Sequence, residues 1–113
     1  MKFMVLLTRG EWQESGSQEE RERVFGSIQE WWGKLSASGQ IVEGHQLQHP
    51  QTATTVIIEG GQSLLVDRPL IEAKEAIGGY AILEAADLDA ALAVVRTFPM
   101  PDGKAEVRAV VER

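Results

Sequence analysis

VDRPLIEAKEAIGGY, at positions 66–80, is the stretch of this chain that decides its fold. It places a charged, turn-like connector of about ten residues between two runs that are typical of buried strands, whereas a plain connector takes two to five. Ordering a longer loop costs more conformational entropy, and long loops on a rigid sheet are where binding and catalysis concentrate. The connector is therefore the first candidate for a site, and the runs beside it indicate a sheet.

Upstream of the connector, the sequence first predicts one strand and one long helix. Residues 3–8 form an apolar run whose length is typical of a strand buried on both faces. Residues 8–16 are polar and predict a loop. Ser17 and Glu20 match a capping box, and apolar side chains then recur at helical spacing, so we expect a helix over residues 18–37.

Two features of this helix have alternative interpretations. Gly26 and Gly33 each cost about 1 kcal/mol relative to Ala, which indicates either simple tolerance or the close approach of a strand or another subunit. Trp31 and Trp32 are adjacent and point about 100° apart. Either they form one wide apolar face, or one anchors the core while the other lines a cleft or an interface.

The remaining elements are strands and a second helix. Residues 41–47 and 52–59 are strand-like, and Gly60-Gly61 turns the chain into a hairpin completed by residues 63–66. After the connector, residues 79–84 predict a strand. Asp87 then caps a helix that prolines end, and residues 106–111 predict a last strand. The inner face of this second helix would carry five apolar residues: Leu88, Ala91, Leu92, Val95 and Phe98.

This order of elements predicts an α+β fold, the ferredoxin-like split βαβ arrangement with an added hairpin strand. Two helices would cover one face of an antiparallel sheet. The other face also needs cover, because the strands have few purely polar sides. In so small a chain a second copy is the simplest cover, so we expect a homodimer with the two sheets packed face to face.

Composition narrows the class of protein. A length of 113 residues predicts a single domain over residues 1–113. The net charge of −6 is spread evenly, with 8 acids and 5 bases in residues 1–60 and 9 and 6 in residues 61–113, so no basic patch favours direct nucleic-acid binding. There is no cysteine, which excludes disulfides, thiolate metal sites and cysteine nucleophiles. No membrane span or signal peptide is indicated, and we expect a cytoplasmic protein.

Several stretches together resemble the DGPF, or YCII-related, family of small bacterial proteins. They are Asp67-Arg68-Pro69-Leu70, Glu72-Ala73-Lys74-Glu75, Gly78-Gly79-Tyr80, Asp87-Leu88-Asp89-Ala90-Ala91 and Ala105-Glu106-Val107-Arg108-Ala109-Val110. The resemblance implies a ferredoxin-like dimer, a dimeric α/β barrel. It also implies two roles. Related YCII proteins have been proposed as enzymes because of a His–Asp pair in a cleft, and some DGPF members are encoded beside extracytoplasmic-function sigma factors.

The chain departs from the family signature at three positions. Arg68 replaces a glycine, Leu70 an aromatic residue and Ala109 a late proline. Losing the aromatic residue makes the pocket beside the loop smaller or less able to stack on a ligand. Neither His45 nor His49 falls where the family's histidine would lie, near Ile28, so the His half of the pair is missing.

The candidate site is a cleft by the 67–80 segment. Its predicted ligand-binding residues are Glu72, Lys74, Glu75, Tyr80 and Trp31. Asp67 is the candidate catalytic residue, as a general acid or base. The plainer interpretation is that Asp67 caps the turn and that the charges of the connector form a solvated surface cluster.

Neither a metal nor a cofactor is predicted. On an extended strand His45 and His49 would point the same way but lie about 13 Å apart, too far for joint zinc ligation. The glycine pairs lack a G-x-G-x-x-G context. We therefore expect a small dimeric protein that binds a small ligand, with a regulatory role. The alternatives are an enzyme that uses Asp67 on a small organic substrate, and an interaction module associated with a sigma factor.

Overall fold

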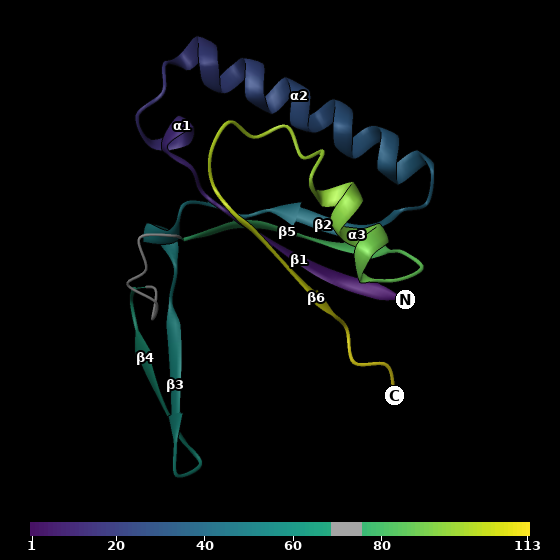
Figure 1. The fold of residues 1–113 in the computed structure, drawn as a ribbon. Coiled ribbons are helices and arrows are strands. Elements are labelled where there is room, and N and C mark those ends of the chain that lie inside the picture. The colour runs from purple at the N-terminus through teal and green to yellow at the C-terminus, as the bar shows by residue number, and fades with distance from the viewer. Residues whose placement is uncertain (69–75) are drawn as a thin grey trace.

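The computed structural model describes residues 1–68 and 76–113, which form two layers, a sheet and the helices above it, with a hairpin that stands apart (Figure 1). In chain order the elements are β1 (Lys2–Thr8), α1 (Glu11–Glu14), α2 (Gln18–Ala37), β2 (Ile41–Gln46), the 3-10 helix η1 (Pro50–Thr52), β3 (Thr55–Glu59), β4 (Gln62–Val66), β5 (Ile77–Glu84), α3 (Leu88–Val95) and β6 (Ala105–Ala109).

The main sheet has four strands in the order β2-β5-β1-β6, all antiparallel to their neighbours. Val5 in β1 lies opposite Ala81 in β5 and Val107 in β6. β5 therefore lies between β1 and β2, which α2 connects, and β1 lies between β5 and β6, which α3 connects. These two interleaved βαβ units confirm the predicted α+β, ferredoxin-like arrangement.

The core lies between this sheet and the helices. Phe3, Val5 and Leu7 point toward the helices and are buried, as are Ala81 and Leu83 opposite them. The alternate residues of β1 are only half-buried, because α2 and α3 both lie on one side of the sheet (Figure 1). Within a single chain the expectation that β1 is buried on both faces is therefore not met. The face away from the helices is called the open face below.

Helix α2 has the predicted bounds, because a local signal begins it. The Ser17 hydroxyl accepts a hydrogen bond from the Glu20 backbone N–H at 3.1 Å. A Cβ added at Gly26 or Gly33 would meet no atom within 4 Å, so no strand of the described chain needs to approach these positions. Within the protomer both glycines are simply tolerated.

Helix α1 corrects the expectation of a loop over residues 8–16. The Ser15 backbone N–H donates to the Glu11 carbonyl at 2.8 Å, which closes one helical turn. Trp12 in this turn is only 3% exposed and packs edge-on against Phe25, with ring centroids 5.0 Å apart. Tertiary burial of one aromatic ring thus orders a stretch whose local composition indicates a loop.

Helix α3 begins as predicted, and Ala91, Val95 and Phe98 of its predicted inner face lie in or against the core. The Asp87 carboxylate accepts from the Ala90 N–H at 2.8 Å, whereas the helix ends at Val95, before the prolines. Leu88 and Leu92 are 48% and 36% exposed, so their placement on the inner face was wrong. Fully buried Ala91 lies at the centre of the contact instead, and Val94, Val95 and Phe98 pack around it. A small residue at the centre lets the short helix lie close to the sheet.

The β3–β4 hairpin forms a separate two-stranded sheet. Gly60 and Gly61 have φ of +57° and +77°, the conformation that a two-residue turn joining twisted strands requires. The hairpin extends away from α2, beyond the open face of the main sheet (Figure 1). The predicted extra hairpin thus exists, and it stands beside the main sheet as an arm.

In the described residues no helix has the length and apolar character needed to span a membrane.

Candidate functional site

A cavity of about 530 Å³ lies between α2 and the main sheet. Its walls are mostly aromatic and aliphatic: Trp12, Phe25, Ile28, Trp32, Phe98 and Met100. Gly44, Gly78 and Gly79 line it from the strands, and three glutamines are its main polar side chains. No Asp, Glu, Lys or Arg among the described residues lines it. A cavity of this size and character suits a small, uncharged organic molecule.

Trp12 supplies the most specific polar group of this cavity. Its ring lines the wall, and its indole Nε1 is buried without a hydrogen-bond partner in the described part of the chain. An unsatisfied buried donor costs about 1–3 kcal/mol, and most such groups in native structures have a partner. An acceptor oxygen on a bound molecule would supply that missing partner.

The two adjacent tryptophans of α2 have separate roles. The Trp31 Nε1–H donates to the Thr97 hydroxyl at 2.8 Å, and its ring packs edge-on against Phe98. Trp32 lines the cavity and lies so close to Gly44 that a Cβ there would be 2.4 Å from the ring. The pair therefore follows the second interpretation of the sequence: Trp31 anchors α2 to the α3 end of the core, and Trp32 lines a cleft.

The predicted site residues do not converge within the described structure. Asp67 is exposed at the end of β4 and lines neither of the two cavities described in this section. Tyr80 lies on the open face, where its hydroxyl donates to Glu43 at 2.8 Å, and Trp31 lies on the opposite side of the sheet. Glu72, Lys74 and Glu75 lie outside the described residues. The 67–80 segment reaches the cavity through Gly78 and Gly79.

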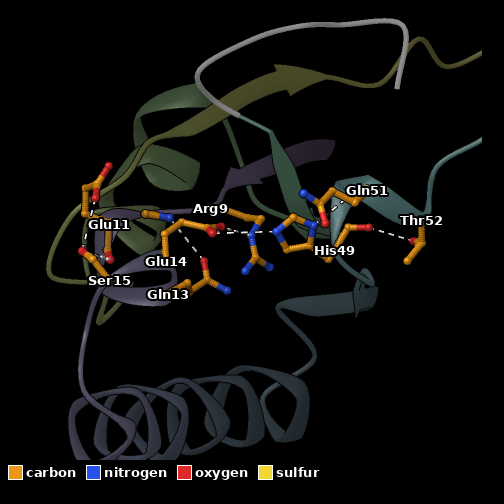
Figure 2. A network of polar contacts seen from close by, with 9 residues as sticks. Arg9, Glu11, Gln13, Glu14, Ser15, His49, Gln51 and Thr52 are labelled. Atoms are coloured by element: carbon orange, nitrogen blue, oxygen red, sulfur yellow. Dashed lines mark hydrogen bonds and ion pairs between the residues drawn. The ribbon is translucent and has the colours of Figure 1, made fainter. Parts of the chain in front are cut away.

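A second cavity, of about 590 Å³, adjoins the first at Thr8 and contains a charged network (Figure 2). The Arg9 Nε–H donates to Glu14 at 2.7 Å, and His49 Nε2 lies 3.7 Å from the other oxygen of that carboxylate. The hydrogen bond from Arg9 lowers the pKa of Glu14 and outweighs the opposing effect of desolvation. Glu14 is therefore an anion at neutral pH, held between two nitrogen groups.

The tautomer of His49 follows from its other nitrogen. The Gln51 backbone N–H donates to His49 Nδ1 at 3.1 Å, so neutral His49 carries its proton on Nε2, on the side of Glu14 (Figure 2). His45 lies elsewhere, with its ring 6.0 Å from that of Tyr80. In residues 1–68 and 76–113 no group of three or more His, Asp or Glu side chains is placed to hold a metal ion.

Sequence reasoning missed four of these residues, namely Trp12, Arg9, Glu14 and His49. Arg9 directly follows β1, Trp12 and Glu14 lie in α1, and His49 directly precedes η1, so no regular spacing links them. One signal was present: Trp12 is a large aromatic residue in a polar stretch, and such a residue is seldom left in solvent.

The fold and the two cavities define a small α+β protein of ferredoxin-like topology with a ligand-sized cleft under its long helix. The model of the YCII-related domain family matches residues 1–113, so the chain belongs to the YCII-related domain family.

Among solved structures, the chain is similar to 5-chloro-2-hydroxyhydroquinone dehydrochlorinase (TftG) from Burkholderia phenoliruptrix AC1100, in complex with 2,5-dihydroxybenzoquinone. The two share 19% sequence identity, with 94% of this chain and 91% of that chain covered, at a TM-score of 0.49. No curated protein matches the chain.

Proposed function

We propose that this YCII-related protein binds a small, uncharged, ring-containing molecule in the cavity between α2 and the main sheet. The observations that carry the proposal are the mostly aromatic and aliphatic wall of this cavity, to which the Trp12 ring belongs, and the Trp12 Nε1–H, which is buried and unpartnered in the described structure. The ligand would place a carbonyl or hydroxyl oxygen at this donor, which requires the Trp12 ring to turn its Nε1 toward the cavity.

The chemistry of the walls supports this ligand class. Trp12, Phe25, Trp32 and Phe98 offer ring faces and edges, which favour stacked or edge-on contact with another ring. Among the described residues no Asp, Glu, Lys or Arg lines the cavity, and His45 is its one ionisable lining residue, so a charged ligand would lose its hydration with little chance of an ion pair. An uncharged ring with one acceptor fits both conditions.

The test compares two probes of similar size, acetophenone with a carbonyl acceptor and ethylbenzene without one, by isothermal titration calorimetry or saturation-transfer NMR. We expect acetophenone to bind about fivefold more tightly, the effect of one hydrogen bond of about 1 kcal/mol. Trp12→Phe keeps a ring and removes the donor, so it should abolish the preference. Trp31→Phe is the matched control, since its N–H bonds Thr97.

The outcomes separate clearly. Binding of both probes with equal affinity by the wild-type protein would refute the role of the Trp12 donor. If neither probe bound, the proposal that this cavity binds such a ligand would be refuted. Loss of the preference in Trp31→Phe as well would mean that the substitutions act through the fold.

An enzymatic role is the second candidate, and the Arg9–Glu14–His49 network favours it. A carboxylate that faces a histidine in a cleft can orient its imidazole, which is part of the arrangement of a general acid or base. The cavity of this network shares Thr8 with the proposed ligand cavity. Turnover of a small organic substrate that is lost in His49→Gln but kept in Asp67→Asn would support it.

The other functional alternatives stay predictions. Asp67 as the acid or base is tested by the reverse outcome, loss of turnover in Asp67→Asn with the fold retained. A regulatory role and an association with a sigma factor rest on the family resemblance alone, and co-purification with a sigma factor would test the latter.

We also propose that the protein works as a homodimer through its open face. In β1 and β5, Met4 lies opposite Ile82 and Leu6 opposite Tyr80, and all four are half-buried on this face. No described helix covers them (Figure 1). A second copy packed face to face would remove this apolar strip from water.

A further inference from the structure

The β3–β4 hairpin exposes more apolar surface than a free surface arm normally does. Val56, Ile58 and Leu65 are 52%, 71% and 70% exposed. Val56 lies opposite Leu65 in the hairpin register, and Ile58 is two residues along the same strand, so the three side chains share one face of the arm. This set of three is called the arm face below.

An arm of this kind needs something to pack on. An isolated two-stranded hairpin is at best marginally stable in water, and among the described strands β3 and β4 pair only with each other. Exposed apolar strands also invite unwanted association unless they are covered. The polar residues of the hairpin are Thr55 at its base, Ser63 opposite Ile58, and Glu59 opposite Gln62 at the tip.

We infer that the arm face binds a second copy of this chain, so that each protomer clasps its partner. The hairpin extends beyond the open face of its own sheet (Figure 1). A second protomer seated on that face therefore lies beside the arm, and two-fold symmetry places its own arm beside the first protomer. This inference rests on the homodimer proposed above and adds the element that holds it together.

Surface area supports a second copy as the occupant. The chain exposes 8012 Å², whereas a compact monomer of 12.4 kDa exposes about 6,100 Å². The excess of roughly 1,900 Å² is more than twice the ~800 Å² per partner that a stable interface buries. The radius of gyration of 15.9 Å likewise exceeds the ~13 Å expected for a compact chain of this length.

The open face and the arm face are both needed to reach an interface of ordinary size. Four strands about 4.8 Å apart and six residues long give a flat area of about 400 Å², and the hairpin gives about 160 Å². Neither reaches ~800 Å² alone, and together they give a flat area of about 560 Å², to which the relief of the side chains adds. On the open face the apolar strip of Met4, Leu6 and Ile82 is central, and charged side chains lie along its edges: Glu43 on β2, and the Glu106–Arg108 ion pair on β6.

Sedimentation velocity over a range of protein concentrations tests the clasp. The variant is Ile58→Thr with Leu65→Thr, because Thr keeps strand propensity while it removes apolar surface. Each dimer contains two arms, so we expect its Kd to rise at least about a hundredfold. The control is Leu88→Thr, a leucine 48% exposed on α3 that should leave the Kd unchanged.

A second measurement keeps the test decisive if the arm variant folds poorly. Hydrogen exchange of the wild-type amides over residues 55–66 should slow as protein concentration rises through the Kd. A wild-type monomer at all concentrations would overturn both the homodimer and the clasp. A wild-type dimer whose Kd is unchanged in the arm variant, or whose arm amides exchange equally fast at every concentration, would overturn the clasp alone.

Discussion

Among the glycines that line the cleft, Gly44 leaves the least room for an added methyl group. A Cβ added there would lie 2.4 Å from Cζ2 and 2.6 Å from Cη2 of Trp32, and 2.6 Å from the Tyr80 carbonyl oxygen. Carbon atoms in good contact are about 3.5–4.0 Å apart. In Gly44→Ala the Trp32 ring must therefore retreat by about 1 Å or more, and β2 must also move away from β5.

The magnitude follows from two opposing effects. Overpacking of this kind costs about 1–3 kcal/mol. Replacing glycine in a strand recovers about 0.5–1 kcal/mol of conformational entropy. The expected net loss is about 1–2 kcal/mol, and since 1 kcal/mol changes the Tm of a domain of this size by about 4 °C, the Tm should fall by about 4–8 °C.

Thermal unfolding by calorimetry would measure this, with Gly33→Ala as the matched control. Gly33 lies inside α2, four residues before its last residue, and its added methyl would meet no atom within 4 Å, so the same change should raise the Tm by about 4 °C. Adding Trp32→Leu to Gly44→Ala should recover part of the loss, because the ring in the way is removed. A Gly44→Ala protein as stable as the wild type would refute this placement of the Trp32 ring.

Three further predictions concern local contacts. Ser17→Ala removes the N-cap of α2 and should cost about 1 kcal/mol in chemical unfolding. The hydrogen bond with Glu43 raises the pKa of Tyr80, so tyrosinate should form above the usual pH of about 10, and Glu43→Gln should lower that midpoint. Because the folded pKa is raised, this stability is present below pH ~10 and lost as the pH rises through the folded pKa. Ultraviolet titration reports it cleanly, since the chain has one tyrosine. For Glu14 the pKa is lowered, so the stability given by Arg9 is present above pH ~4.5 and lost as the pH falls through the folded pKa. Acid unfolding of the wild type and of Arg9→Met should accordingly differ above that pKa and converge below it.

Local signals in the sequence were enough to predict the scaffold. Ser17 with Glu20 located the start of α2, and Gly60-Gly61 located the hairpin turn, because each is a short-range hydrogen-bond or dihedral requirement. The order of strands and helices then selected one of few topologies. These features depend on residues within a turn or two of one another.

The cleft was harder to predict because it depends on distant partners. Trp12 stands in a polar stretch of the sequence, and its burial depends on contact with Phe25, thirteen residues later. His49 meets Glu14 only because the segment after β2 returns to the end of β1. Leu88 and Leu92 matched the helical period, yet the close approach of Ala91 turned them outward. Helical periodicity predicts which face of a helix is apolar, whereas packing against the sheet determines which residue lies at the centre of that face.

The central place of β1 in the main sheet has a consequence for synthesis. Its two neighbours pair through residues far along the chain, as when Val5 meets Ala81 and Val107. At 5–20 residues per second, the ribosome needs roughly 5–20 s to add the ~100 residues that separate Val5 from its last partner. Until β5 emerges, which takes up most of that interval, Phe3, Val5 and Leu7 have no strand to pair with. The nascent chain thus carries a strongly apolar strand unpaired until its last third is synthesised.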